Sequence, residues 1–434
     1  MSALQKSMLK NKLPPKVPRT SGISQLAPFG VARRKDYSPV PWSQYYEKYM
    51  DLETGEGVFR VYLSPEPDHP QRPRIFTLHG GGYSGLSWAL FTEEITNMIH
   101  CQVISMDIRG HGETKATNPD DLNIDTLVGD VERVIQKLFG DEIPPLILLG
   151  HSMGGAIAVH AAHSPALESY IQGVAVIDVV EGTAMEALAS MQSFLRSRPT
   201  HFKSIEHAIE WCVRSGQVRN VESAKVSMPS QIVNCDTGLL ATSELDSYSG
   251  SAPAAPQPSR HAPRADRIAE EGDGDGDGDA LDAEPEDIQY SGSSKTDVLC
   301  ERALTMTMQC PGQRLSSGSL RAYSLLNRYK WRVDLSRTEQ HWAGWFRGLS
   351  AAFLGTRAPR LLLLASVDGL DRELTVGQMQ GKFQMQVLTR CGHAVQEDTP
   401  AEVARVLASF ALRHRLTEAT ERGELMRLVS APGC

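Results

Sequence analysis

A single short motif most constrains what this chain can fold into. Residues 150–154 read Gly-His-Ser-Met-Gly, with an apolar run before them and an alanine-rich apolar run directly after. This pattern places Ser152 at the junction of a buried strand and a helix. A G-x-S-x-G sequence at such a junction predicts a strained turn that exposes the serine hydroxyl, flanked by small residues because the backbone packs closely. Ser152 is therefore the predicted nucleophile.

The other apolar runs predict an α/β fold. Strands are expected at Arg74–Gly80, Cys101–Gly110, Leu146–Ser152, Val174–Val180, Arg360–Gly369 and Lys382–His393. Helices are expected between them, at 92–100, 126–140, 155–163 and 401–415. The strands are apolar on both sides rather than alternating, which indicates a mostly parallel central sheet with helices on both faces. Residues 60–70 are expected to add an antiparallel edge strand.

An activated serine needs a general base. In folds that carry the nucleophile on a strand-to-helix turn, the chain order is serine, acid, histidine. His393 lies in the sequence Cys-Gly-His-Ala-Val-Gln-Glu-Asp directly after the last apolar strand. Gly392 before it permits a loop that turns the imidazole toward Ser152. His393 is the predicted base.

Two aspartates are candidates for the acid that orients His393. Asp178 ends the strand after the nucleophile helix, and Asp368 ends the following strand. Both side chains would lie at the carboxyl edge of the sheet, where such folds bind ligands. Position in the fold slightly favours Asp368, and Asp178 stays open as the alternative.

The developing oxyanion of an ester needs backbone N–H donors. One is expected from Met153, the residue after the nucleophile, and the other from Gly81 or Gly82 in the glycine run after the strand at 74–80. The sequence Asp-Ile-Arg-Gly-His-Gly-Glu-Thr at 107–114 is interpreted as a loop that braces the rim of the site. Asp107 and His111 are accordingly expected to be structural.

Composition divides the chain into regions. Residues 237–328 are rich in Pro, Ser, Gly and acidic side chains and poor in bulky apolar ones, which predicts a long disordered insertion. It separates two parts of one domain, 37–236 and 329–420, with a flexible arm at 1–36 and a C-terminal tail at 421–434. The stretch 273–284 matches a calcium-loop pattern, but Pro285 and the absence of flanking amphipathic helices argue against calcium binding.

Charge and composition exclude several functions. The net charge of −8 gives no basic footprint for nucleic acid. No apolar run is long enough to span a membrane, and the N-terminus lacks a secretory signal. The seven cysteines are scattered without metal-binding spacing, so we expect reduced thiols, no metal or cofactor, and a cytoplasmic and nuclear location.

Several longer stretches point to one family. They include "LGHSMGGAIAVH" (149–160), "VIDVVEGTAMEAL" (176–188), "WFRGLS" (345–350), "CGHAVQED" (391–398), "FTLHGGGYSGLSWALF" (76–91), and the runs 190–232 and 361–388. The order of serine, glycine-rich loop and late histidine is similar to that of the α/β-hydrolase fold. Together these stretches resemble protein phosphatase methylesterases over most of residues 1–235 and 330–415. The resemblance is far more specific than the serine motif alone.

The resemblance implies a definite reaction. Members of the family remove the methyl ester from the carboxyl-terminal leucine of the protein phosphatase 2A catalytic subunit, without a metal. It implies Ser152 as nucleophile, His393 as base and Asp178, rather than Asp368, as the acid. It also implies a helical cap at 181–232, docking on the phosphatase tail and active site that holds inactive phosphatase, and contact with the scaffold subunit. Two alternatives stay open: a small-molecule serine esterase, and a non-catalytic phosphatase-binding scaffold.

Overall fold

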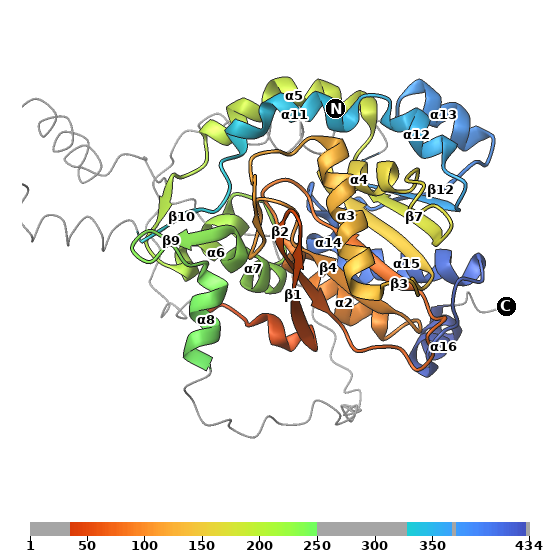
Figure 1. Ribbon diagram of the computed structural model, residues 1–434, viewed down its shortest axis with the longest axis horizontal. Coiled ribbons are helices and arrows are strands. Elements are labelled where there is room, and N and C mark those ends of the chain that lie inside the picture. The colour runs from red at the N-terminus through yellow and green to blue at the C-terminus, as the bar shows by residue number, and fades with distance from the viewer. Residues whose placement is uncertain (1–34, 250–327, 367–369, 431–434) are drawn as a thin grey trace, which may run out of the picture. The chain divides into compact units, whose positions relative to one another are not determined.

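The computed structural model of the protein (Figure 1) describes residues 35–249, 328–366 and 370–430. All of these except 247–249, the end of helix α8 (Ala241–Ser249), belong to one compact unit built on a large sheet. In spatial order the strands are β1 (Lys48–Thr54), β2 (Gly57–Leu63), β4 (Gln102–Met106), β3 (Arg74–Leu78), β6 (Leu146–His151), β7 (Ile171–Ile177), β11 (Arg360–Leu364) and β12 (Gln384–Val387), with β5 (Lys115–Ala116) beside β2. The strands from β4 to β12 are parallel, whereas β1, β2 and β5 pair antiparallel. The predicted mostly parallel sheet is confirmed.

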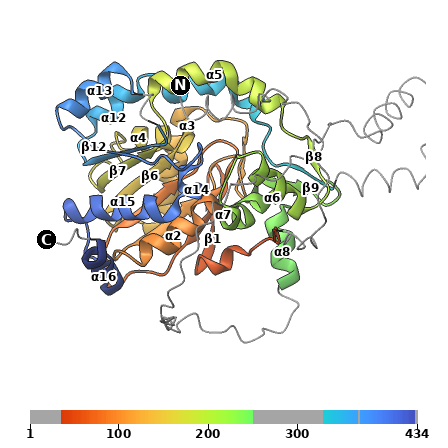
Figure 2. The same ribbon diagram turned by 180° about the vertical axis from the view of Figure 1, so that it is seen from behind.

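Helices cover both faces of this sheet, as Figures 1 and 2 show from opposite sides. One face packs against α3 (Ile124–Phe139), α4 (Met153–Ala161) and α12 (Leu349–Gly355). The other packs against α2 (Ala89–Thr96) and α15 (Pro400–Arg413). Every residue of β3 and β4 is buried, because each side of these strands faces an apolar layer. The two layers therefore explain why the central strands are apolar without alternation.

A smaller helical layer lies beyond the carboxyl edge of the sheet. It contains α5 (Glu181–Arg196), α6 (Ile205–Arg214), α7 (Val221–Ser227) and a three-stranded sheet in the order β8 (His201–Phe202), β10 (Tyr329–Trp331), β9 (Ile232–Asn234). Helix α11 (Glu339–Phe346) lies beside α5 in both views of the ribbon (Figures 1 and 2). The predicted bounds of 181–232 therefore include only part of the observed cap, because β10 and α11 come from the chain after residue 327.

The remaining elements are short. They are η1 (Trp42–Gln44), η2 (Gly85–Trp88), η3 (Met228–Gln231), η4 (Leu335–Thr338), α13 (Arg372–Met379), α14 (Val395–Asp398) and α16 (Glu421–Ser430). No helix in the described parts of the chain has the length and apolar character needed to cross a membrane.

Three predicted boundaries need correction or fall outside the structure. Residues 241–249 form helix α8 instead of belonging to a disordered insertion, and the Tyr329 hydroxyl donates a hydrogen bond to Glu244 in that helix. Residues 421–430 form helix α16 instead of a tail. The amide and hydroxyl of Thr420 donate hydrogen bonds to the Met98 and Asn97 carbonyls, and the Gly423 backbone packs closely against Met98. The predicted arm up to residue 34 and the insertion from 250 to 327 lie outside the described residues.

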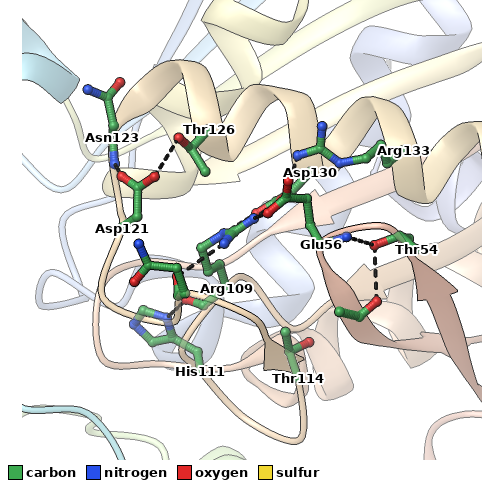
Figure 3. Close-up of polar contacts among 12 residues, drawn as sticks. Thr54, Glu56, Arg109, His111, Thr114, Asp121, Asn123, Thr126, Asp130 and Arg133 are labelled. Atoms are coloured by element: carbon green, nitrogen blue, oxygen red, sulfur yellow. Dashed lines mark hydrogen bonds and ion pairs between the residues drawn. The ribbon is translucent and has the colours of Figure 1, made fainter.

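A buried ion pair fixes the loop at 107–114 to the core. Arg109 is completely buried and makes two hydrogen bonds of 2.7 Å to the Asp130 carboxylate of α3. Glu56 and Arg133 add ion pairs at 3.3 and 2.9 Å, so the four side chains form the charged cluster drawn in Figure 3. His111, further along the same loop, donates from Nδ1 to the Arg109 carbonyl. The cluster therefore positions a loop that reaches the candidate active site.

Candidate active site

Ser152 occupies the tight turn that the sequence predicts. It links β6 to α4 with φ 52° and ψ −119°, a strained conformation for a residue with a side chain. A Cβ atom at Gly150 would lie 2.1 Å from the Gly154 carbonyl oxygen, and one at Gly154 would lie 2.2 Å from the Leu78 carbonyl oxygen. Both glycines are therefore required by close backbone approach, and together they lift Ser152 above the sheet edge.

The Gly154→Ala variant is expected to destabilise the protein by roughly 3 kcal/mol, because the methyl group has only backbone atoms to displace. Chemical denaturation measures the change in the free energy of unfolding. Gly344→Ala is the matched control, since Gly344 lies in helix α11 with open space around its Cβ position. The control should stabilise slightly, by up to about 1 kcal/mol. Equal stability of the two variants would contradict the close-approach argument.

His393 and Asp178 form a hydrogen-bonded pair beside this turn. Their Nδ1 and Oδ2 atoms are 2.8 Å apart. The second carboxylate oxygen of Asp178 accepts a 3.0 Å hydrogen bond from the Ala365 amide, which fixes its orientation at the end of β7. Because a carboxylate only accepts, His393 donates from Nδ1, and its Nε2 is left with a lone pair that can take a proton. The alternative acid, Asp368, lies outside the described residues.

The Ser152 hydroxyl shares one pocket with His393. The two residues line an apolar cavity of about 120 Å³. No group in the described ranges makes a hydrogen bond to the Ser152 hydroxyl, so proton transfer to His393 requires the two side chains to approach further. His151 supports the arrangement, since its Nε2 donates a 2.8 Å hydrogen bond to the His393 carbonyl. Burial lowers the pKa of His151 well below its usual value, so this donor stays neutral.

The three predicted oxyanion donors also line this cavity, but their amides differ. The Gly82 N–H donates to His111 Nε2 at 2.9 Å, so it is already occupied. No acceptor among the described residues is bonded to the Gly81 N–H. Met153 is the first residue of α4, and the first N–H groups of a helix have no intrahelical partner. The geometry therefore favours Met153 and Gly81 over Gly82 as donors.

The neighbouring loop holds the glycine run in place. Asp107 accepts hydrogen bonds from the amides of Gly85 and Glu113, at 2.7 and 2.9 Å. Burial raises the pKa of Asp107 to about 7 and lowers the pKa of His111 to about 4, so His111 remains a neutral acceptor for Gly82. These contacts support the structural roles expected for Asp107 and His111.

Most of the remaining walls of the pocket come from the cap, and Tyr83 comes from the loop after β3. Sequence reasoning did not single out these residues for the site: Tyr83, Met191, Leu195, Arg198, Leu335, Thr338, Trp342, Trp345 and Phe346. Three aromatic residues of α11 recur at helical spacing, which predicts an apolar face but not what that face covers. The cavity is thus suited to an apolar side chain close to the serine.

Two buried carboxyl groups tie the His393 loop to the cap. Asp398 accepts 2.6 Å hydrogen bonds from the amides of Gly392 and Arg219. Glu397 is completely buried, and its Oε2 accepts hydrogen bonds from the hydroxyls of Ser223 and Ser227 in α7, at 2.9 and 2.6 Å. Burial raises the pKa of Glu397 to about 8, so the group is protonated at neutral pH.

This buried acid predicts a pH dependence of stability. The unfolded carboxyl titrates near about 4.3, so between that pH and 8 the folded protein holds a proton that the unfolded chain has lost. Glu397 should therefore lower the free energy of unfolding as pH rises through this window, by about 1.4 kcal/mol per pH unit. Glu397→Gln cannot titrate and should make the pH dependence less steep by this amount, whereas the contribution of Asp107 remains. Denaturation at pH 5, 6.5 and 8 tests this, and parallel slopes in both proteins would refute it.

The described residues contain no group of three or more His, Cys, Asp or Glu side chains placed to hold a metal ion. The donor set around Ser152 is instead a hydroxyl, an imidazole–carboxylate pair and free backbone amides. That set matches nucleophilic acyl transfer.

Comparison with known proteins agrees with this geometry. The sequence model of the alpha/beta hydrolase family matches residues 75–406. A crystal structure of E-2-(acetamidomethylene)succinate hydrolase has the same fold, with a TM-score of 0.53 at 13% identity, over 84% of this chain and 98% of that one. The chain is therefore an enzyme of the α/β-hydrolase family.

Curated relatives narrow this class. The chain is 45% identical to protein phosphatase methylesterase 1 of Homo sapiens, over 96% of this chain and 97% of the relative. It is 46% identical to the protein of the same name from Bos taurus, over 96% and 98%. A probable protein phosphatase methylesterase 1 of Caenorhabditis elegans is 36% identical, over 93% and 84%. The chain belongs to the protein phosphatase methylesterase family.

Proposed function

We propose that this protein is a carboxylesterase that removes the methyl ester from the carboxyl-terminal leucine of the protein phosphatase 2A catalytic subunit. The observation that carries the proposal is the His393–Asp178 hydrogen bond beside Ser152, at one apolar pocket in a chain of this family. The apolar walls suit a leucine side chain, and the strained turn presents a hydroxyl to its ester carbonyl.

The first half of the reaction forms an acyl-enzyme. His393 Nε2 takes the proton of the Ser152 hydroxyl while the oxygen attacks the ester carbonyl carbon. The negative charge on the carbonyl oxygen is held by the amides of Met153 and Gly81, each of which contributes about 3 kcal/mol in such sites. The intermediate collapses when the carbon–methoxy bond breaks and His393 gives its proton to the leaving oxygen, which departs as methanol.

The second half reverses these roles with water. His393 removes a proton from a water molecule, whose oxygen attacks the acyl carbon. The bond to Ser152 then breaks, and the serine oxygen recovers the proton from His393. The product is the free leucine carboxylate. Asp178 keeps the imidazole in the required tautomer and stabilises its charged form in both halves.

The protein is further proposed to dock on the phosphatase and hold the inactive form, with contact to the tail, the active site and the scaffold subunit. Docking also supplies a reason for a pocket covered by a cap, because a protein partner can bring Ser152 and His393 together when it binds. The pocket accepts only the end of the substrate chain, so affinity for the whole partner must come from other surfaces.

The decisive experiment compares demethylation of intact phosphatase with demethylation of its isolated tail peptide and of small methyl esters. Much faster turnover of the intact protein is expected if docking assembles the site. Equal turnover of small esters, with no response to the phosphatase, would instead favour a small-molecule esterase. Failure of a fluorophosphonate probe to label Ser152 would favour a non-catalytic scaffold.

A further inference from the structure

One cationic side chain of the active-site pocket has no anionic partner among the residues that the structure describes. Arg198 follows directly after α5 and lines the cavity that contains Ser152 and His393. Its Nε atom is buried and has no hydrogen-bond partner among the described residues, and no carboxylate of those residues forms an ion pair with it. Burying an unpaired charge is costly, and such groups are rare unless they have a function.

Arg198 is nevertheless held firmly in position. Its guanidinium carbon lies 3.5 Å from the centroid of the Trp331 ring, a stacked cation–π contact. The Trp331 indole N–H in turn donates a 2.7 Å hydrogen bond to the Pro199 carbonyl. Burial without a neutralising carboxylate lowers the pKa of Arg198 to about 10, and at neutral pH the side chain is still charged. The N–H donors of the guanidinium are therefore held in one orientation before any anion binds.

A second cavity adjoins the pocket at Arg198. This groove has a volume of about 610 Å³ and shares Leu195, Arg198 and Leu335 with the active-site pocket. The pocket itself has a volume of about 120 Å³, much smaller than that of the groove. It can enclose little more than one residue, so the preceding residues of a peptide substrate must leave through an adjoining space.

We propose that the groove holds the extended segment preceding the esterified residue, and that Arg198 is a specificity-determining residue that binds a carboxylate side chain in that segment. This inference rests on the proposed function, because it concerns the substrate of the same reaction. A planar guanidinium with several donors suits a carboxylate, which accepts two parallel hydrogen bonds. Binding an acidic side chain would also supply the countercharge that the described residues lack.

The other charged groups of the groove cannot replace Arg198. Arg196, Lys330, Asp334 and Glu339 line the same space but are exposed, so water screens their charges. The acidic pair would also repel a carboxylate placed near them. Only close to the Trp331–Arg198 stack is a cation partly withdrawn from water, where a charge-assisted hydrogen bond is strongest.

The test uses pairs of peptides that end in leucine methyl ester and differ in one side chain. In each pair, Glu or Gln occupies the second, third or fourth position from the C-terminus, and methanol release gives kcat and KM. Wild-type protein should show a KM about tenfold lower for Glu than for Gln at one of these positions, the effect of one charge-assisted hydrogen bond. Arg198→Met should abolish this ratio, and Arg198→Lys should keep part of it. Arg214→Met is the control, because Arg214 is exposed on α6 outside both cavities.

The ratio is taken within each variant, so a uniform loss of activity or stability cancels. Wild-type protein that does not discriminate Glu from Gln at any position would overturn the proposal, whatever the variants do. A preference that persists unchanged in Arg198→Met would assign it to another cation and also overturn the proposal. Absence of methanol release from every peptide with wild-type protein would refute the proposed function instead.

Discussion

Ser152→Ala is expected to lower kcat for methyl-ester hydrolysis on the order of 10⁶-fold, because Ser152 supplies the hydroxyl that forms the acyl-enzyme. The other serine and threonine hydroxyls that line the pocket, on Ser215 and Thr338, donate hydrogen bonds to backbone carbonyls. The residual rate should still exceed that in water, since the amides of Met153 and Gly81 continue to stabilise the oxyanion. Methanol release measured with enzyme in excess gives the rate of the chemical step. Binding of the phosphatase should persist, because docking does not require the hydroxyl.

Two measurements make this result specific. Ser409→Ala removes an exposed hydroxyl on α15, remote from the pocket, and should leave kcat within about twofold of wild type. Thermal unfolding of Ser152→Ala should show no loss of stability beyond about 1 kcal/mol, which excludes unfolding as the cause. Turnover close to wild type in Ser152→Ala would end the assignment of this serine as nucleophile.

Asp178→Asn is expected to lower kcat about 10⁴-fold. The asparagine amide would donate to His393 Nδ1, so the ring would carry its proton on Nε2 and could not accept one from Ser152. The hydrogen bond from the Ala365 amide can persist to the asparagine oxygen, so the loop should keep its structure. The measurement is kcat on a methyl-ester peptide, with stability followed in parallel.

Asp368→Asn is the matched control for this variant. The same substitution is made at the aspartate that the sequence analysis kept as the alternative acid, and we expect an effect of less than about tenfold there. A large loss at Asp368 with normal turnover at Asp178 would reverse the assignment of the acid. Large losses at both positions would require a second method, such as titration of the His393 ring by NMR.

The central strands could be predicted because they are buried on both faces. The apolar runs at 74–80, 101–110 and 146–152 correspond to β3, β4 and β6, and the start of each run agrees within one residue, but the run at 101–110 extends four residues beyond the end of β4. Strand β1 was missed, since only Leu52 of its seven residues is buried and the pattern carries little apolar signal. Strands β8 to β10, of two or three residues each, are too short to leave a period and depend on tertiary pairing.

The site divides in the same way. Ser152 could be predicted because its tight turn requires small residues on both sides, and the two flanking glycines form a recognisable motif. Arg198 and the aromatic residues of α11 leave none, because their importance comes from the distant segments that the cap brings against the pocket. The hydrogen bond from the Gly82 amide to His111 could not be predicted either, because it is a single contact between two loops.

The small cap sheet has a consequence for how this enzyme can vary in length. Strands β9 and β10 pair side by side, and the Cys235 amide donates a hydrogen bond to the Arg328 carbonyl. Residues 235 and 328 are therefore held close together in space. Doubling the length of a tether between such fixed points adds only about 0.6 kcal/mol of closure entropy. Insertions and deletions between residues 249 and 328 can therefore accumulate during evolution while the active-site pocket keeps its shape.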